Sequence, residues 1–316
     1  MSARAMLRWV LLAQLALAGA IAYGALRYGA LASTWLALAC GLACVLLARM
    51  LLTANNFRAT ARFSSATPAP FRIGAGAMLR LFAEEFIATL THSSWFMAHA
   101  LAHQRIHAGS TAPPLLLLHG YGCNSGYWAH LVRELDAARI SHATLDLEPM
   151  LAGIDDFVPA VRRAVEALCA ASAAPRVIIV GHSMGGLVAR AYLRAHGSAQ
   201  VAHVFTIGTP HHGTSLASKG PGLNAVQMQY DEGGDASAGA WLRQLAASES
   251  AHTRALITSL FTHHDNIVAP QTSSVLEGAQ NIAFGGVGHV ALGRNRRVLA
   301  RLMLEIAKLS TREDNL

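Results

Sequence analysis

Residues 176–190 read RVIIVGHSMGGLVAR, and this stretch decides the fold. Its apolar VIIV predicts a buried strand, and the run that begins at Leu187 predicts a helix. Between them Ser183 stands in a Gly-x-Ser-x-Gly turn with Gly181 and Gly185. A side chain at either glycine is expected to clash with the neighbouring strand or helix, and the turn strains the serine backbone. We therefore expect the Ser183 hydroxyl to project at the carboxyl edge of a sheet, beside a helix N-terminus.

Strands and helices alternate around this stretch. Short apolar runs bounded by turn residues predict four more strands, at 115–118, 143–147, 255–261 and 282–284. Helical periodicity lies between the earlier strands. This order predicts a mostly parallel sheet with helices on both faces, which is an α/β fold.

The turn at Ser183 has the alternative interpretation of an ordinary strand-to-helix connection, so its chemistry depends on partners. A serine hydroxyl needs a base to remove its proton, and the base needs a carboxylate to fix its tautomer. Asp265 and His289 lie in the loops that follow the last two predicted strands. We therefore predict a catalytic triad of Ser183, Asp265 and His289, with His263 and His264 as supporting or surface residues.

An acyl-transfer site also needs an oxyanion hole, usually two backbone N–H groups. Met184 follows the nucleophile and is expected to supply the first N–H, and Tyr121 is expected to supply the second. The residues that shape the two loops are Gly181, His182 and Gly185 at the turn, and His119 and Gly120 before Tyr121. No cofactor and no metal is expected, since the adjacent His211 and His212 lack ligand spacing along a helix.

Together these motifs resemble those of the α/β-hydrolase superfamily, and within it the bacterial triacylglycerol lipases and esterases. The resemblance begins near residue 113 and rests on LLLLHGYG (115–122), VGHSMGGLVAR (180–190), IGTPHHGT (207–214), HHDNIVAP (263–270) and GVGHVAL (286–292). It implies an α/β-hydrolase fold, the triad and oxyanion hole named above, and a lid at about residues 213–240. A plain solvated loop is the alternative for that lid.

The N-terminal region has a different character. The whole chain is 53% hydrophobic and only 14% charged, which is too apolar for an ordinary soluble protein. Residues 7–26 and 31–52 are each about long enough to cross a bilayer, and residues 27–29 form a short turn between them. This pattern predicts a transmembrane helical hairpin. A cleaved signal peptide ending near residues 20–22 is the alternative for the first run.

Positive charge sets the expected orientation of the hairpin in the membrane. Arginines gather at the two outer ends of the hairpin, at positions 4, 8, 49, 58 and 62, whereas the turn offers only Arg27. Both ends and the catalytic domain are therefore expected on the cytoplasmic side of a bacterial-type inner membrane, with the periplasmic side as the alternative. We divide the chain into an anchor (1–54), a linker with an amphipathic helix (55–112) and a catalytic domain (113–316).

The amphipathic helix carries an apolar stripe at helical spacing: Leu79, Phe82, Phe86, Ile87 and Leu90. We expect this stripe to pack on the catalytic domain, and contact with the lipid surface is the alternative.

The expected function is that of a membrane-associated serine hydrolase that cleaves carboxylic esters, lipidic ones in particular, through an acyl-enzyme on Ser183. An acyltransferase with the same acyl-enzyme and a non-catalytic membrane scaffold are the alternatives. The expected partners are the ester substrate and the membrane. The net charge is +7, but the arginines are scattered and form no basic stripe, so a nucleic-acid partner is not expected.

Overall fold

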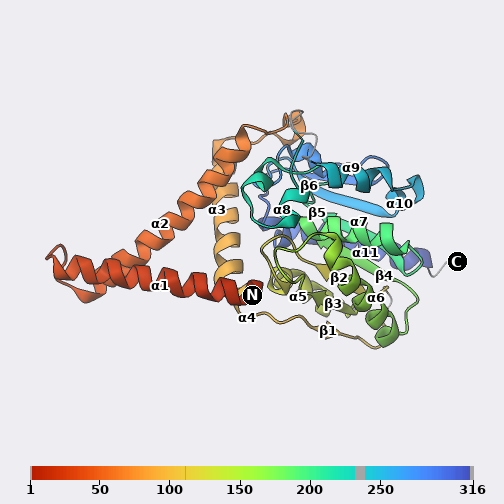
Figure 1. Cartoon of the computed structure of the whole chain (residues 1–316), viewed down its shortest axis with the longest axis horizontal. Coiled ribbons are helices and arrows are strands. Elements are labelled where there is room, and N and C mark those ends of the chain that lie inside the picture. Colours follow the sequence, from red (N-terminus) through yellow and green to blue (C-terminus); the bar gives the residue numbers. More distant parts are fainter. Residues whose placement is uncertain (1, 111, 232–238, 314–316) are drawn as a thin grey trace.

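The computed structural model describes residues 2–110, 112–231 and 239–313. Its centre is a sheet built from β1 (Gln104–Arg105), β2 (Leu115–Leu118), β3 (His142–Leu145), β4 (Val177–His182), β5 (Val201–Ile207), β6 (Ile257–Thr262) and β7 (Gln280–Phe284). The strands lie in the order β1-β3-β2-β4-β5-β6-β7. All neighbouring strands are parallel except β1 and β3, which are antiparallel. The mostly parallel sheet that the sequence predicts is confirmed (Figure 1).

The described residues form helices that precede the sheet, connect its strands and cover both of its faces. They are α1 (Ala3–Arg27), α2 (Thr34–Ala61), α3 (Ala75–Thr91), α4 (Met97–His99), α5 (Ala129–Ala137), α6 (Val158–Ser172), α7 (Met184–His196), α8 (Leu223–Gln227), α9 (Ala240–Ala247), α10 (Ala251–Ala255) and α11 (Arg296–Glu313). Side chains of α5 and α11 join the core on one face, and those of α6, α7 and α9 join the core on the other.

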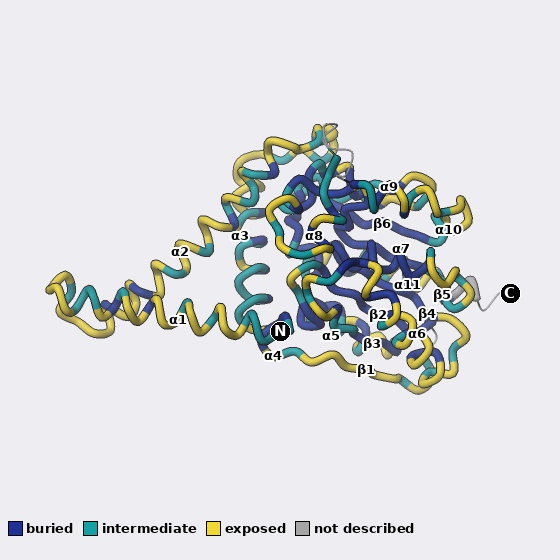
Figure 2. Tube along the Cα trace, in the orientation of Figure 1, coloured by how far each residue is buried: buried dark blue, intermediate teal, exposed yellow. Residues whose placement is uncertain are grey.

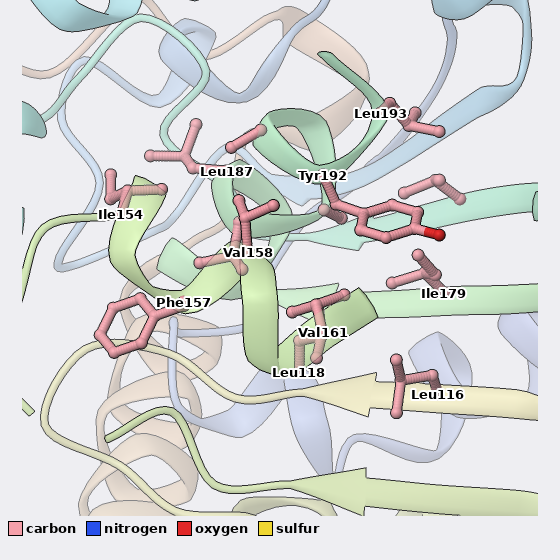
Figure 3. Packing of buried hydrophobic residues seen from close by; sticks show 14 of the residues in the cluster. Leu116, Leu118, Ile154, Phe157, Val158, Val161, Ile179, Leu187, Tyr192 and Leu193 are labelled. Carbon is pink, nitrogen blue, oxygen red and sulfur yellow. The ribbon is translucent and has the colours of Figure 1, made fainter. Parts of the chain in front are cut away.

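The two-sided core follows from the alternation of side chains along each strand. In β2, Leu116 and Leu118 belong to the core under α6 and α7, whereas Leu115 and Leu117 belong to the opposite core. Figure 3 shows Leu118 near Val161 of α6 and Leu116 further along β2, in the same core cluster. All four leucines are fully buried, and each such burial stabilises the fold by roughly 1.5–3 kcal/mol.

The N-terminal helices α1 and α2 extend away from the catalytic domain as a hairpin, and their surfaces are mostly exposed in Figure 2. They are 25 and 28 residues long and apolar enough to cross a membrane, so they fit the predicted transmembrane hairpin. The two helices meet through small residues. A Cβ placed on Gly41 overlaps the carbonyl of Ala18, and Ala22 and Ala37 are also buried. Such small residues let helix backbones approach closely.

Two features of the connecting region differ from the sequence prediction. The helix α2 continues to Ala61, so the irregular linker begins seven residues later than residue 55. The face of α3 that packs on the catalytic domain carries Leu81, Glu85 and Ala88, not the predicted apolar stripe. Within that stripe, Leu79 and Ile87 are exposed, and Phe82 contacts Phe57 of α2 with ring centroids 5.9 Å apart. Two residues of the stripe are therefore directed toward the surface and Phe82 toward the hairpin, while Phe86 and Leu90 are half-buried.

The first turns of α1 also contact the connecting region. Arg4 donates a hydrogen bond of 2.9 Å to the carbonyl of Ala100, and Arg8 donates one of 2.9 Å to the carbonyl of Ala98. From α2, Arg49 donates a bond of 2.8 Å to the hydroxyl of Ser94. The base of the hairpin is therefore attached to residues 94–100 as well as through the chain itself.

Candidate active site

Ser183 occupies the sharp turn between β4 and α7. Its backbone angles are φ 54° and ψ −122°, a conformation that non-glycine residues rarely adopt. The turn is held by a bond of 2.8 Å from the Ser183 N–H to the carbonyl of Ile207. It is also tightly packed, since a Cβ on Gly181 lies 2.5 Å from the carbonyl carbon of Gly185. The strain and the two glycines that the sequence predicts are both present here.

Asp265 and His289 lie together beside this turn. Oδ2 of Asp265 accepts a hydrogen bond of 2.8 Å from Nδ1 of His289, and both side chains are buried. Oδ1 of Asp265 accepts bonds from the N–H groups of Ile267 and Val268, at 2.8 and 2.7 Å. The carboxylate therefore has a fixed orientation and fixes the imidazole tautomer, which leaves Nε2 of His289 without a proton.

The surroundings of His289 favour its use as a base. Burial alone lowers the pKa of His289, but the charge and hydrogen bond of Asp265, with a contribution from Glu85, raise the pKa above its usual value. The neighbouring His182 is also buried, and burial holds its pKa well below the usual range. His182 stacks on Tyr127 and donates from Nε2 to the carbonyl of His289 at 3.3 Å. His182 thus supports the histidine loop as a neutral ring.

The loop that carries the predicted oxyanion donor lies against Ser183. A Cβ on Gly120 lies 3.0 Å from the Cβ of Ser183, so a larger residue at position 120 would crowd this close approach. His119 fixes the loop: its Nδ1 donates to the carbonyl of Gly120 at 2.9 Å, and its Nε2 accepts from the N–H of Leu147 at 2.9 Å. Met184 begins α7, so its N–H has no partner within the helix.

The segment predicted as a lid contacts both residues of the proposed oxyanion hole. The hydroxyl of Tyr121 donates to the carbonyl of Pro221 at 2.6 Å. Nδ2 of Asn224 in α8 donates to the carbonyl of Met150 at 2.8 Å and contacts the sulfur of Met184 at 3.4 Å. Residues 232–238 of the predicted lid lie outside the described residues.

Sequence reasoning missed three polar residues that hold the acid and base loops. Asn266 accepts a bond of 2.9 Å from the N–H of His289, and Gln271 donates one of 2.9 Å to the carbonyl of Asp265. Glu85 of α3 accepts bonds from the two residues that follow His289. Asn266 and Gln271 could have been suspected from their place in and beside the HHDNIVAP loop, whereas no local pattern marks Glu85.

Three further histidines near the site contact the same loops or the core. Nδ1 of His264 accepts a bond of 3.1 Å from the N–H of Gly286, and the ring of His263 packs on Phe71. Nδ1 of His211 is 3.2 Å from a guanidinium nitrogen of the buried Arg190. These contacts give His263, His264 and His211 packing and supporting positions.

A cavity of about 500 Å³ adjoins the acid loop. It lies between the end of α2, the linker and the loop that follows β6, and its lining includes Phe57, Ile73, Met78, Asp265 and Gln271. Ser183 does not line it. The cavity therefore reaches the acid side of the site from the direction of the hairpin.

Comparisons with known proteins agree with this architecture. A family model described as the alpha/beta hydrolase fold matches residues 113–228. The chain is 32% identical over 116 residues to a triacylglycerol lipase of Pseudarthrobacter phenanthrenivorans, and equally to one of Burkholderia plantarii. Each alignment covers 34% of this chain, and 36% and 32% of the two relatives. The chain therefore spans about a third of the length of the curated relatives it matches.

Solved structures show the same fold at lower identity. A lipase of Bacillus licheniformis in its mature form superposes with a TM-score of 0.56 at 16% identity, covering 65% of this chain and 97% of that one. Lipase B of Aspergillus fumigatus gives a TM-score of 0.50 at 20% identity, covering 62% and 54%. The family match includes Ser183 but ends before Asp265 and His289, so the argument for those two residues rests on their geometry.

Proposed function

We propose that this chain, which has the α/β-hydrolase fold, is a membrane-associated serine hydrolase of the lipase and esterase type that acts on lipidic carboxylic esters. The observation that carries the proposal is the buried 2.8 Å bond between His289 and Asp265, beside a serine in strained geometry. A packed core needs neither feature. Strain at a buried, reactive residue is typical of active sites.

In the proposed reaction, Nε2 of His289 takes the proton of the Ser183 hydroxyl as the oxygen attacks the ester carbonyl. The N–H groups of Tyr121 and Met184 stabilise the negative oxygen of the tetrahedral intermediate. His289 then gives its proton to the departing alcohol, which leaves an acyl group on Ser183. A water molecule, activated by His289, releases the carboxylic acid and restores the serine.

The lipidic substrate class is supported by the anchor and its position. Two apolar helices project from the same domain that holds the site, and the cavity beside Asp265 is bounded by the end of α2. The segment formed by residues 213–231 is proposed as part of a lid, since it contacts Tyr121 and Met184. An anchored enzyme meets membrane esters at high local concentration.

The test uses the full chain purified in detergent with p-nitrophenyl esters of increasing acyl length. We expect the wild type to turn over, with the optimum chain length separating esterase from lipase. Ser183→Ala should lose about a thousandfold or more in kcat. Ser172→Ala is the matched control, because the hydroxyl of Ser172 bonds only within α6.

A fluorophosphonate probe should label Ser183 in the wild type and in Ser172→Ala, but not in Ser183→Ala. Folded wild-type protein that neither hydrolyses any ester nor reacts with the probe would refute the proposal. New ester formed only when an alcohol acceptor is added would instead identify an acyltransferase.

A further inference from the structure

The helix α3 places a buried carboxylate against the histidine loop. Glu85 is 1% exposed. Its Oε1 accepts a bond of 3.0 Å from the N–H of Val290, and its Oε2 accepts one of 2.9 Å from the N–H of Ala291. These are the two residues that directly follow His289. Both carboxylate oxygens are therefore used to hold the backbone at the predicted base.

The backbone around His289 is shaped to receive this carboxylate. A Cβ on Gly288 lies 2.5 Å from Oε2 of Glu85, so residue 288 must lack a side chain for the contact to form. Burial raises the pKa of Glu85 from its usual value, whereas the two N–H bonds favour the charged form. A buried carboxylate is costly and is rarely kept without such partners.

Neighbouring contacts fix the register of α3 on this loop. Glu84 accepts a bond of 2.7 Å from Nδ2 of Asn295, and the hydroxyl of Thr91 accepts one of 3.0 Å from Arg294. These bonds flank Glu85 along α3 and tie the helix to the chain after the histidine loop. The helix α3 is thus attached at three points to the chain between residues 290 and 295, and only the contact of Glu85 is to the histidine loop itself.

We propose that Glu85 is a positioning residue for the base, which makes the region between the anchor and the catalytic domain a structural part of the active site. The proposal rests on the proposed function. Glu85 does not touch the substrate and acts through His289. Its carboxylate keeps residues 290 and 291 in place, and with them the ring of His289 against Asp265.

The effect of the Glu85 charge on the pKa of His289 distinguishes this positioning role from simple packing. The groups that face His289 are Asp265 on the acid loop, Glu85 on α3 and His182 at the turn. The two carboxylates favour the protonated imidazole. Removing the Glu85 charge should lower the pKa of His289, so the acid limb of the pH profile for kcat/KM should move to lower pH.

The test compares Glu85→Gln with Glu84→Gln in the full chain. A glutamine at position 85 can accept only one of the two N–H bonds, because an amide NH2, which is a donor, replaces one of the two carboxylate oxygens. We expect kcat to fall at least tenfold with little change in KM, together with the shifted acid limb. Glu84→Gln keeps its acceptor oxygen for Asn295 and should match the wild type in both measurements.

An unchanged kcat and pH profile in folded Glu85→Gln would overturn the proposal. So would an equal loss in both variants without a shift of the limb, since that pattern means general destabilisation. The probe reaction at Ser183 in the wild type tests the proposed function separately. If the wild type fails that reaction, the proposed function fails, and the Glu85 proposal falls with it for that independent reason.

A second inference concerns a cluster of ligand-type side chains at the edge of the sheet, on the segment that carries β1. His107, Asp136 and His142 each offer one nitrogen or oxygen atom, and these atoms lie within 4.8 Å of one another. Nε2 of His107 is 3.1 Å and Nε2 of His142 is 3.9 Å from Oδ1 of Asp136. Arg105 bonds the other carboxylate oxygen at 2.9 Å.

The tautomer of His142 marks it as a ligand. Its Nδ1 donates to the carbonyl of Ile140 at 2.9 Å, so Nε2 is the basic nitrogen. The side chain of His142 is fully buried, and within the described residues its Nε2 has no hydrogen-bond partner. Its lone pair therefore faces a carboxylate oxygen, an arrangement that a cation between them stabilises.

We propose that His107, Asp136 and His142 bind a divalent transition metal, with zinc as the best match. Two imidazoles and one carboxylate suit zinc and leave a fourth position for water. The metal would join the β1 segment to the end of α5 and the start of β3. Its expected effect is on stability, since the cluster belongs to a different part of the sheet from Ser183.

The test uses full-length protein and measures zinc binding by calorimetry and the melting temperature. The protein is purified without a histidine tag, because a tag would add zinc ligands to the 16 histidines of the chain itself. We expect the wild type to bind one more zinc than His107→Gln or Asp136→Asn, and to melt higher when zinc is added. His252→Gln, an exposed histidine on α10, is the control and should behave as the wild type.

Equal zinc stoichiometry and equal affinity in the wild type and both cluster variants would overturn this site. A melting temperature of the wild type that does not change when zinc is added would overturn it as well. In that case a protonated His142, which would donate to Asp136, accounts for the cluster.

Discussion

Both oxygens of the Asp265 carboxylate accept hydrogen bonds from fixed partners within the fold. Replacing Asp265 with Asn keeps the shape but puts an amide where the carboxylate accepts from Nδ1 of His289. The imidazole then favours the tautomer with its proton on Nε2, which cannot accept the serine proton. We expect kcat to fall about ten-thousand-fold.

Steady-state kinetics on the preferred p-nitrophenyl ester measure that loss, with Asp156→Asn as the control. Asp156 accepts a bond from the N–H of Gly153 and lies outside the triad. If Asp265→Asn kept more than a tenth of wild-type activity, Asp265 would not be the residue that orients His289.

A buried ion pair beside the nucleophile helix carries a second prediction. Arg190 of α7 is fully buried, and Nε and a terminal nitrogen of its guanidinium bond Glu249 at 2.6 and 2.7 Å. Glu249→Gln leaves this guanidinium buried without its counter-ion, so the free energy of unfolding should fall by about 3–5 kcal/mol. Denaturant unfolding measures the change.

The matched control is Glu166→Gln, which breaks the exposed pair of Glu166 with Arg162 on α6. Solvent screens that pair, so the unfolding midpoint should hardly move. Similar midpoints for the two variants would show that burial does not set the strength of the Arg190 pair.

Among the elements, the strand β4, the turn at Ser183 and α7 were predictable from sequence because each depends on local pattern. Asp265 and His289 were also predictable as candidates, since they follow short apolar strands in order. The face of α3 that packs on the domain was not predictable from sequence. Apolar periodicity selected Leu79 and Ile87, which are exposed, whereas the buried face uses Glu85 with backbone partners about 205 residues away.

Polar residues whose hydrogen-bond partners are distant in the sequence leave no periodic pattern. For the same reason, the cluster of His107, Asp136 and His142 could not be predicted from sequence. Its members are separated by 29 and 6 positions in the sequence. Only the antiparallel pairing of β1 with β3 brings His107 to the other two. The sequence contains the three proposed ligands, but it does not show that the fold brings them together.

The crossing of α1 and α2 provides a prediction for an element. A Cβ on Gly41 overlaps the backbone of Ala18, whereas one on Gly19 meets nothing within 4 Å. Gly41→Leu should therefore separate the helices and cost roughly 1–3 kcal/mol, while Gly19→Leu should be neutral. Unfolding in mixed detergent micelles with increasing SDS measures both variants. Equal midpoints would contradict the small-residue crossing.

At the scale of the whole molecule, both outer ends of the hairpin lie on the side of the catalytic domain (Figure 1). The arginines at positions 4, 8, 58 and 62 are at those ends, and Arg27 is near the tip. This distribution predicts a cytoplasmic catalytic domain. A reporter that is active only in the periplasm, fused after Leu316, should stay inactive. Activity there, with an inactive cytoplasmic reporter at the same position, would reverse the orientation.

The bonds from Arg4 and Arg8 to the carbonyls of Ala100 and Ala98 give the hairpin a second attachment, to the connecting region that leads to the domain with Ser183. A domain joined by one flexible strand can swing and sample a hemisphere of orientations. In the proposed membrane-anchored hydrolase, two attachments would set both the height of the active site above the bilayer and the direction in which it opens. The search for a lipid substrate would then be two-dimensional, with lateral diffusion of the lipid replacing tumbling of the enzyme.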